Sequence, residues 1–378
     1  MRLEDVCTVF TDGDWIESKD QSEKGIRLVQ TGNIGEGIYL EKESRAKYIP
    51  EDTFKRLKCT EIFPGDILVS RLPEPVGRAC IIPEKTERMI TAVDCTICRP
   101  DEALISKDYL CYFMRSNAYY MRLLGNVTGT TRKRISRKNL GNVELKVPTK
   151  EEQKTVVERL DCLVKVIDSR TKELQLLDDL IKARFIELFG NPDVNSKGWN
   201  ECALSEKLKV VGGYAFKSDQ FDEERGIPVL RIGNINAGFF RPVNLVYWHE
   251  DESLERYIVY PGDLVMSLTG TVGKDDYGNV CILGDDYGKY YLNQRNAKLE
   301  IVEGIDKYYL SQLLKFKQIK KRLTGISRGV RQANISNKDI LNLVVPVPPM
   351  EIQEQFAAFV AQVDKSKVAV MNNKPLWC

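Results

Sequence analysis

The segment Gly25-Ile-Arg-Leu-Val-Gln-Thr-Gly-Asn-Ile34 returns in the second half of the chain as Gly226-Ile-Pro-Val-Leu-Arg-Ile-Gly-Asn-Ile235. Three further blocks repeat in the same order. This shared order shows an internal duplication, which predicts two domains of the same fold. The repeated blocks are Phe63-Pro-Gly-Asp-Ile-Leu-Val-Ser70 with Tyr260-Pro-Gly-Asp-Leu-Val-Met-Ser267, Thr128-Gly-Thr-Thr-Arg132 with Thr324-Gly-Ile-Ser-Arg328, and Val147-Pro-Thr-Lys-Glu-Glu-Gln153 with Val347-Pro-Pro-Met-Glu-Ile-Gln353.

Each copy predicts a mixed module of short strands and helices. Residues 28–30 and 229–232 resemble strands that end in Gly-Asn turns, and Pro-Gly-Asp leads into strands at 67–69 and 264–266. Helical apolar spacing covers residues 109–124 and 307–323, which predicts helical structure at matching positions of the two copies. We therefore expect an α+β fold made of two similar domains, at residues 1–148 and 191–347.

A long helix is expected after the first module, over residues 149–190. Thr149-Lys-Glu-Glu152 forms a capping-box pattern, and Gly190-Asn-Pro192 is a stop signal. At 1.5 Å per residue such a helix is about 60 Å long. Its apolar residues follow a heptad pattern, which is typical of a coiled-coil seam; they are Leu160, Ile167, Leu174, Ile181 and Leu188, with Val156, Leu163 and Leu177 between them.

A second helix is expected over residues 348–378, with Phe356, Val363 and Val370 at heptad spacing. Antiparallel pairing of the two helices would place the modules at opposite ends of a rod; the alternative is that each helix packs on its own module. The second helix is the shorter one, so the pairing cannot run along the full first helix. A truncated C-terminal region, or a first helix that pairs with another chain, would account for the difference, and light scattering tests the latter.

Positive charge is concentrated at matching positions of the two copies, although the whole chain carries only +2. Residues 112–146 hold eight basic residues and one acidic residue, and residues 306–338 hold nine and one. A charge run alone is typical of a solvated surface, but two at equivalent positions favour binding to a phosphate backbone.

Enzyme motifs are missing from the sequence. Gly270-Thr-Val-Gly-Lys274 lacks phosphate-loop spacing, and the single histidine, His249, has no nucleophile motif near it. Cys95 and Cys98 have the spacing of metal ligands, but they lie in a strand-like alternation without a second pair, so we interpret them as buried strand residues. We expect no catalytic site and no metal site.

The composition indicates a cytoplasmic protein that does not enter a membrane. Hydrophobic residues make up 43% of the chain and charged residues 29%, and no apolar run approaches the roughly 18 residues that span a bilayer. The N-terminus has no signal-peptide core, so the ten cysteines are expected to be reduced thiols rather than a disulfide framework.

The repeated blocks resemble the specificity subunit of type I restriction–modification enzymes over nearly the whole chain. The resemblance rests on the order and duplication of these motifs rather than on any one of them. They are Gly212-Gly-Tyr-Ala-Phe-Lys-Ser218, Val229-Leu-Arg-Ile-Gly-Asn-Ile235, Pro261-Gly-Asp263, Leu292-Asn-Gln-Arg295, Ile335-Ser336, Val345-Pro-Val-Pro-Pro-Met-Glu-Ile-Gln353 and Ala183-Arg-Phe-Ile-Glu-Leu-Phe-Gly-Asn-Pro192.

The resemblance implies a non-catalytic subunit with two target-recognition domains, each reading one half of a split site in double-stranded DNA. It implies an antiparallel coiled coil of the two helices that sets the unread gap. The implied partners are two methyltransferase (modification) subunits and restriction subunits with translocase activity. S-adenosylmethionine, ATP and Mg would be bound by those partners, so this chain is expected to hold no cofactor.

The resemblance also implies candidate DNA-contacting residues in both domains. A role as turn residues is the alternative for Asn33 and Asn234. The candidates are Thr31, Asn33, Arg71, Arg78, Thr91, Arg132, Lys133 and Arg134 in the first domain, and Arg231, Asn234, Thr269, Lys274, Asn293, Gln294, Arg295, Arg328, Arg331 and Gln332 in the second.

Two other functions stay open. The chain could be the recognition part of a single-chain methyltransferase–nuclease, although the Asn-Pro-Pro-Tyr-type loop and glycine-rich cofactor strand of such an enzyme are missing from it. It could also be a duplicated scaffold without a DNA role, whose basic stretches bind an acidic protein. Steep loss of duplex binding with salt separates DNA binding from the scaffold.

Overall fold

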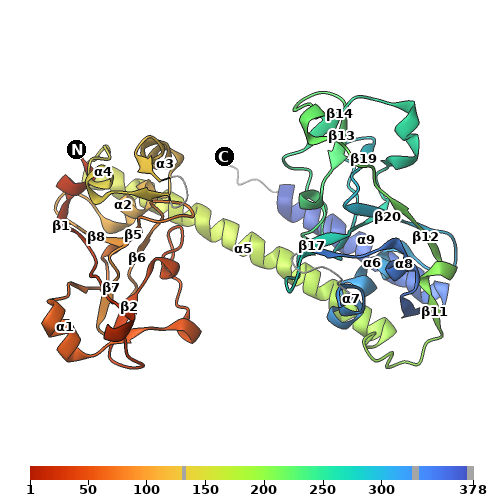
Figure 1. Cartoon of the computed structure of the whole chain (residues 1–378), viewed down its shortest axis with the longest axis horizontal. Coiled ribbons are helices and arrows are strands. Elements are labelled where there is room, and N and C mark those ends of the chain that lie inside the picture. Colours follow the sequence, from red (N-terminus) through yellow and green to blue (C-terminus); the bar gives the residue numbers. More distant parts are fainter. Residues whose placement is uncertain (130–132, 326–331, 373–378) are drawn as a thin grey trace. The chain divides into compact units, whose positions relative to one another are not determined.

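A computed structural model describes residues 1–129, 133–325 and 332–372. The chain divides into two compact units, Met1–Ile167 and Asp168–Cys378. The long helix α5 (Lys150–Phe189) belongs in part to each unit, and Figure 1 shows it as one continuous helix.

Each unit contains the same pair of four-stranded sheets. One sheet of each pair is wholly antiparallel, and the other has a parallel pair at its centre, β2 with β7 or β13 with β19. In the first unit the sheets are β1 (Cys7–Asp12), β8 (Cys95–Pro100), β5 (Ile67–Ser70) and β6 (Ala79–Ile81), and β3 (Tyr48–Ile49), β2 (Ile26–Val29), β7 (Met89–Thr91) and β4 (Glu61–Ile62).

The second unit repeats this strand order with its own residues, so the duplication inferred from the sequence extends to topology. It adds a short pair, β11 (Glu201–Ala203) with β22 (Val344–Pro346). The sheets are β12 (Leu208–Gly212), β20 (Asn296–Ile301), β16 (Leu264–Ser267) and β18 (Val280–Ile282), and β14 (Val246–Trp248), β13 (Ile227–Leu230), β19 (Tyr290–Leu292) and β15 (Ile258–Val259).

The predicted strands at 67–69 and 264–266 are confirmed as β5 and β16. The strand predicted at 229–232 is shifted, because β13 ends at Leu230 and residues 232–234 form a 3-10 turn. The strand predicted at 28–30 is shifted in the same way, because β2 ends at Val29. Short helices complete the units: α1 (Glu51–Leu57), α4 (Arg137–Gly141) and α8 (Asn337–Leu341).

The helical structure predicted at 109–124 and 307–323 is confirmed, and each region forms two helices instead of one. In the first unit, Ser116 starts a new helix by accepting a hydrogen bond from the Tyr119 backbone N–H. In the second unit the backbone of Phe316 is extended, which ends one helix before the next begins. The helices are α2 (Lys107–Phe113), α3 (Asn117–Leu124), α6 (Lys307–Leu314) and α7 (Lys317–Thr324).

The capping box that starts α5 is confirmed. The Thr149 backbone N–H donates to Glu152 Oε2 at 2.9 Å, and the Glu152 N–H donates to Thr149 Oγ1 at 3.4 Å. The Thr149 N–H and hydroxyl both donate to the Glu152 carboxylate, which holds the pKa of Glu152 below its usual value. The hydrogen bonds of the capping box satisfy backbone donors that the first helical turn leaves without partners.

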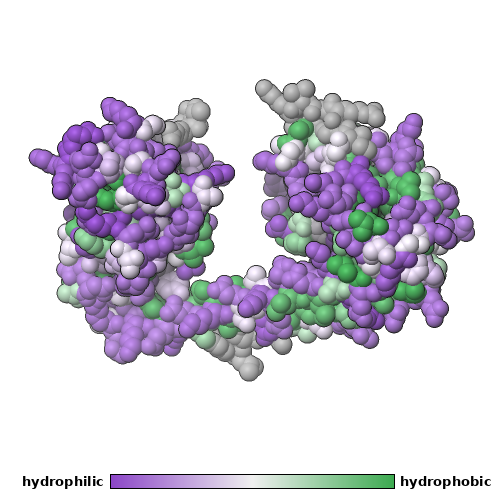
Figure 2. Space-filling view, turned by 90° about the horizontal axis from the view of Figure 1, so that it is seen from below, coloured by the Kyte–Doolittle hydropathy of each residue, from purple (hydrophilic) through white to green (hydrophobic). Residues whose placement is uncertain are grey.

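Helix α9 (Met350–Asn372) packs antiparallel to the C-terminal half of α5 within the second unit. The Lys367 ammonium pairs with Asp178 at 2.7 Å, whereas Phe185 contacts Phe356 with ring centroids 5.4 Å apart. The predicted seam residues Phe356, Val363 and Val370 are buried. Leu176, farther toward the N-terminus of α5, is 58% exposed, and Figure 2 shows hydrophobic side chains on the surface of this helix.

Cys95 and Cys98 lie in β8 and are fully buried, as predicted for strand cysteines. Burial raises the pKa of the Cys95 thiol to about 12. Among the described residues no cluster of three or more metal-binding side chains occurs. No helix in the described ranges is long and apolar enough to span a membrane.

Candidate nucleic-acid interface

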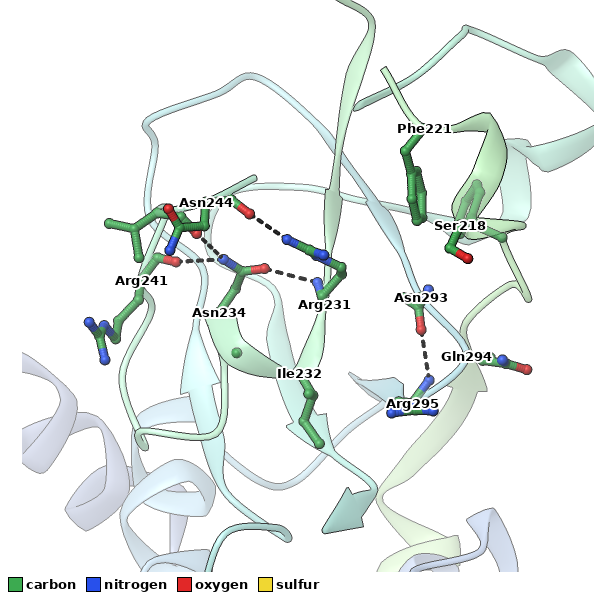
Figure 3. A pocket seen from close by; sticks show the side chains of 13 residues that line it. Ser218, Phe221, Arg231, Ile232, Asn234, Arg241, Asn244, Asn293, Gln294 and Arg295 are labelled. Atoms are coloured by element: carbon green, nitrogen blue, oxygen red, sulfur yellow. Dashed lines mark hydrogen bonds between the residues drawn. The ribbon is translucent and has the colours of Figure 1, made fainter. Parts of the chain in front are cut away.

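A cavity of about 680 Å³ opens on the second unit where β13 and β19 end. Figure 3 shows its polar side chains, which come from four segments of the chain. Five predicted site residues line it, so the structure brings together positions that are far apart in sequence. They are Arg231, Asn234, Asn293, Gln294 and Arg295, and Arg241, Asn244, Ser218 and Phe221 also line the cavity.

Arg231 follows β13 directly and presents its guanidinium group at the surface. Its Nη2 donates to the Asn244 carbonyl oxygen at 2.6 Å (Figure 3). The other guanidinium donors have no partner among the described residues. Arg241, which was not among the predicted contacts, is also exposed at the rim of the cavity. A pair of arginines at one opening provides donors suited to phosphate or guanine.

Asn234 shapes the cavity rather than offering its amide to a ligand. Its Oδ1 accepts from the Arg231 backbone N–H at 2.9 Å, and its Nδ2 donates to the carbonyl oxygens of Arg241 at 2.8 Å and Val243 at 3.0 Å. Its side chain is buried. Because these bonds use both Nδ2 hydrogens, we assign Asn234 to positioning the loop.

Asn33 repeats this arrangement in the first unit. Its Oδ1 accepts from the Gln30 N–H at 3.0 Å, and its Nδ2 donates to the carbonyl oxygens of Leu40 and Glu41. It is buried as well. The turn role considered for the Gly-Asn pairs is therefore confirmed in both copies.

Two further candidates of the first unit are buried. Arg71 is 4% exposed and donates to the Val93 carbonyl oxygen at 2.6 Å, and burial lowers its pKa. Thr91 is fully buried and donates to the Val29 carbonyl oxygen at 3.0 Å. These hydrogen bonds join Arg71 and Thr91 to neighbouring segments of the domain, so we reassign both residues from contact with DNA to support of the surface.

Arg78 is also held by internal carbonyl groups. Its Nε donates to Ile34 at 2.7 Å, and its Nη2 donates to the Thr31 carbonyl oxygen at 2.8 Å. Its Nη1 donates to the carbonyl oxygens of Leu72 and Pro75. Arg78 thus ties the 3-10 turn at Thr31 to the loop after β5, and we reassign it to positioning.

Each unit has a two-stranded ribbon, which is a hairpin in the first unit and joins strands distant in sequence in the second. In the first unit β9 (Val127–Thr128) pairs with β10 (Arg134–Ile135), and Lys133 and Arg134 are exposed. In the second unit β17 (Thr269–Thr271) pairs with β21 (Gln332–Asn334), with Thr269 opposite Asn334. Lys274 lies exposed just beyond β17. The predicted contacts Arg132, Arg328 and Arg331 and the side chain of Gln332 lie outside the described residues.

Not every residue of the basic stretches faces solvent. Lys320 is buried, where its ammonium donates to Asn279 Oδ1 at 2.6 Å and pairs with Asp275. Lys320 therefore stabilises the second unit and does not contribute to the positive electrostatic potential at its surface. The exposed cations of the ribbons remain the candidates for phosphate contact.

Two mixed α/β domains of the same strand topology, each followed by a long helix, define a protein with an internal repeat. A family model for the type I restriction modification DNA specificity domain matches residues 1–178 and again residues 196–376. The chain belongs to this family of type I restriction–modification specificity subunits.

Two relatives of the chain are specificity subunits of type I restriction enzymes. The chain is 26% identical to the type I restriction enzyme MjaVIII specificity subunit of Methanocaldococcus jannaschii over 68% of this chain and 63% of the relative. It is 24% identical to the EcoKI specificity subunit of Escherichia coli over 89% of this chain and 75% of the relative. The chain thus spans less than two thirds of the first relative and three quarters of the second.

Solved structures show the fold. The crystal structure of a type I restriction–modification S subunit from M. genitalium is similar with a TM-score of 0.52 at 15% identity, over 98% of this chain and 90% of that one. A structure of an assembled type I system gives a TM-score of 0.50 at 17% identity, with the same coverage.

Proposed function

We propose that this chain is the non-catalytic subunit that recognises a split DNA site for a type I restriction–modification complex. Each unit would read one half of the site in the major groove, and the helices would fix the unread gap. Because both units belong to one chain, binding of one unit to its half-site raises the effective concentration of the other unit at the second half-site. Tight binding then requires both half-sites.

The observation that carries this proposal is that each copy exposes basic side chains next to polar surface segments. Lys133 and Arg134 occupy the ribbon of the first unit, and Arg231 and Arg295 line the cavity of the second. Exposed cations supply affinity for the phosphate backbone, and fixed polar side chains supply discrimination between bases.

The proposed partners are double-stranded DNA, two methyltransferase subunits and restriction subunits with translocase activity. S-adenosylmethionine, ATP and Mg would be held by those partners, whose chemistry this chain directs to its target. We place the complex in the cytoplasm, and the free thiols of the described cysteines support that placement.

Binding of the chain together with its methyltransferase subunits to duplex DNA at several salt concentrations tests the proposal. We expect the logarithm of the affinity to fall linearly and steeply with the logarithm of salt concentration. We also expect a duplex that carries the host methylation motif to compete better than a scrambled duplex. Weak salt dependence with no preference between duplexes would instead favour the scaffold function.

A further inference from the structure

The two units carry the same backbone turn with different side chains, and the turn lies beside the basic ribbon. In the first unit residues 92–94 connect β7 to β8, and in the second residues 293–295 connect β19 to β20. The sequences are Ala92-Val-Asp94 and Asn293-Gln-Arg295. We call these segments the first turn and the second turn.

Matching hydrogen bonds fix the first residues of both turns. The Val93 N–H donates to the Asp14 carbonyl oxygen at 2.9 Å, and the Gln294 N–H donates to that of Tyr214 at 2.8 Å. Bonds from Ala92 to Val29 and from Asn293 to Leu230 also correspond. The backbone is thus held alike in both copies.

A close glycine contact fixes each turn from the other side. A Cβ atom added to Gly13 would lie 2.3 Å from the Thr91 carbonyl oxygen, and one added to Gly213 would lie 2.2 Å from that of Asn293. Such distances exclude a side chain at either position. Both turns are therefore rigid supports on which the side chains can differ.

In each unit a single residue forms backbone hydrogen bonds both to the turn and to the end of the two-stranded ribbon. The Asp94 carbonyl oxygen accepts from the Arg71 N–H at 2.9 Å, and the Arg71 carbonyl oxygen accepts from the Ile135 N–H in β10 at 3.2 Å. In the second unit Leu268 links Arg295 to Ile335 in the same way, at 2.8 Å and 2.9 Å. A side chain on either turn therefore lies next to the surface that we assign to the phosphate backbone.

The third position of the turn carries opposite charge in the two copies. Asp94 Oδ1 lies 3.0 Å from Arg134 Nη2, and the Asp94 side chain is 27% exposed. Arg295 is exposed, and its guanidinium has no partner among the described residues. A carboxylate accepts from the cytosine N4 amino group, whereas an arginine donates to guanine O6 and N7.

We propose that Asp94 and Arg295 are equivalent specificity residues, Asp94 selecting a cytosine in the first half of the site and Arg295 a guanine in the second. This inference rests on the proposed function. It explains why the two copies share the backbone of the turn but differ in its side chains. The same backbone presents a different side chain to a different base pair in each half of the site.

The test uses the chain in complex with its methyltransferase subunits and a set of duplexes in which each base pair of the target is changed singly. We expect Asp94→Asn to lose preference at one C·G position of the first half, and Arg295→Gln at one G·C position of the second. Each loss should be roughly 5- to 150-fold in relative methylation rate, as for one good base contact. Preference in the other half should stay at its wild-type value.

Matched variants separate base reading from support of the ribbon. Asp108→Asn and Arg225→Gln change exposed side chains outside the turns and should leave every preference unchanged. Lys133→Ala, which removes an exposed cation next to Arg134 and leaves the Asp94–Arg134 ion pair in place, should weaken all duplexes alike. If Asp94→Asn also weakened all duplexes alike, or both turn variants kept the wild-type preferences, the inference would be overturned.

The proposed function fails by a different result. A wild-type complex that shows no preference for a split site would refute that function, whereas a wild-type preference that the turn variants do not alter refutes only the inference. Unchanged preference at the other base pairs of the mutated half shows that the mutated unit is folded.

Discussion

Gln153 and Gln353 occupy the same position in the two copies and make the same hydrogen bond. Gln153 Oε1 accepts from the Ser106 N–H at 2.8 Å, and Gln353 Oε1 accepts from the Asp306 N–H at 2.8 Å. Each Nε2 donates to the carbonyl oxygen five residues earlier, at Pro148 or Pro348. Both glutamines are fully buried, so each helix starts from a fixed point on its own domain.

Replacing Gln153 with alanine should destabilise the first unit by about 2 kcal/mol, because it leaves buried backbone groups without partners. Urea unfolding measures this change in the free energy of unfolding. Gln175→Ala, at an exposed position on α5, is the control and should change it by less than about 0.5 kcal/mol. Equal effects of the two variants would show that the buried contacts do not anchor the helix.

Phe185→Ala should cost about 3–5 kcal/mol, the range for removing a buried aromatic side chain. Phe185 is fully buried, and its ring packs on Phe189, Tyr309, Phe316 and Phe356. Leu176→Ala on the same helix should change stability little, since Leu176 is exposed. Thermal unfolding of both variants tests the pairing of α5 with α9, and a mild effect of Phe185→Ala would argue against it.

Arg241→Ala should weaken binding to every duplex by a similar factor and reduce the slope of the salt dependence by about 0.9, the value for one lost phosphate contact. Arg241 is exposed at the rim of the cavity in the second unit. Fluorescence anisotropy at several salt concentrations gives the slope. Lys365→Ala on α9 is the control, and a slope that stays at the wild-type value in Arg241→Ala would remove Arg241 from the interface.

Buried thiols should make the protein less stable at alkaline pH. Burial raises the pKa of Cys80 and of Cys281 to about 12. Between about pH 9 and about pH 12 the unfolded chain has released these protons while the folded chain retains them, so the free energy of unfolding falls as pH rises. Below about pH 9 these thiols are protonated in both the folded and the unfolded chain, so their full contribution to the free energy of unfolding is present.

Urea unfolding at pH 8, 9.5 and 10 measures that decline. Cys281→Ala should show a shallower decline than the wild type, whereas Cys162→Ala should follow the wild type, because Cys162 is exposed. Parallel curves for the wild type and Cys281→Ala would contradict the assignment.

The repeated blocks were sufficient to predict two related domains, and the Thr149 capping box and heptad spacing predicted the helix that follows the first. The breaks at 114–116 and 315–316 were missed because the apolar spacing continues across them, while a serine cap and an extended phenylalanine interrupt the backbone. Hydropathy patterns do not record such local turns.

The site was predicted in part. The basic ribbons and Arg295 follow from charge and motif, but the inward orientation of Arg71 and Thr91 depends on contacts between strands distant in sequence. Asp94 was missed because an acidic residue gives no signal in a search for phosphate contacts. Aligning the turns of the two copies, Thr91-Ala-Val-Asp with Leu292-Asn-Gln-Arg, would have exposed it.

The central claim is that each unit independently reads one half of a split DNA site. A methylation map of host DNA, made with this chain and with versions whose residues 1–148 or 198–345 come from a relative of different specificity, tests it most directly. We predict a motif of two short halves around an unread gap, of which one half changes with each exchange. A continuous motif, or an exchange that alters both halves together, would contradict the claim.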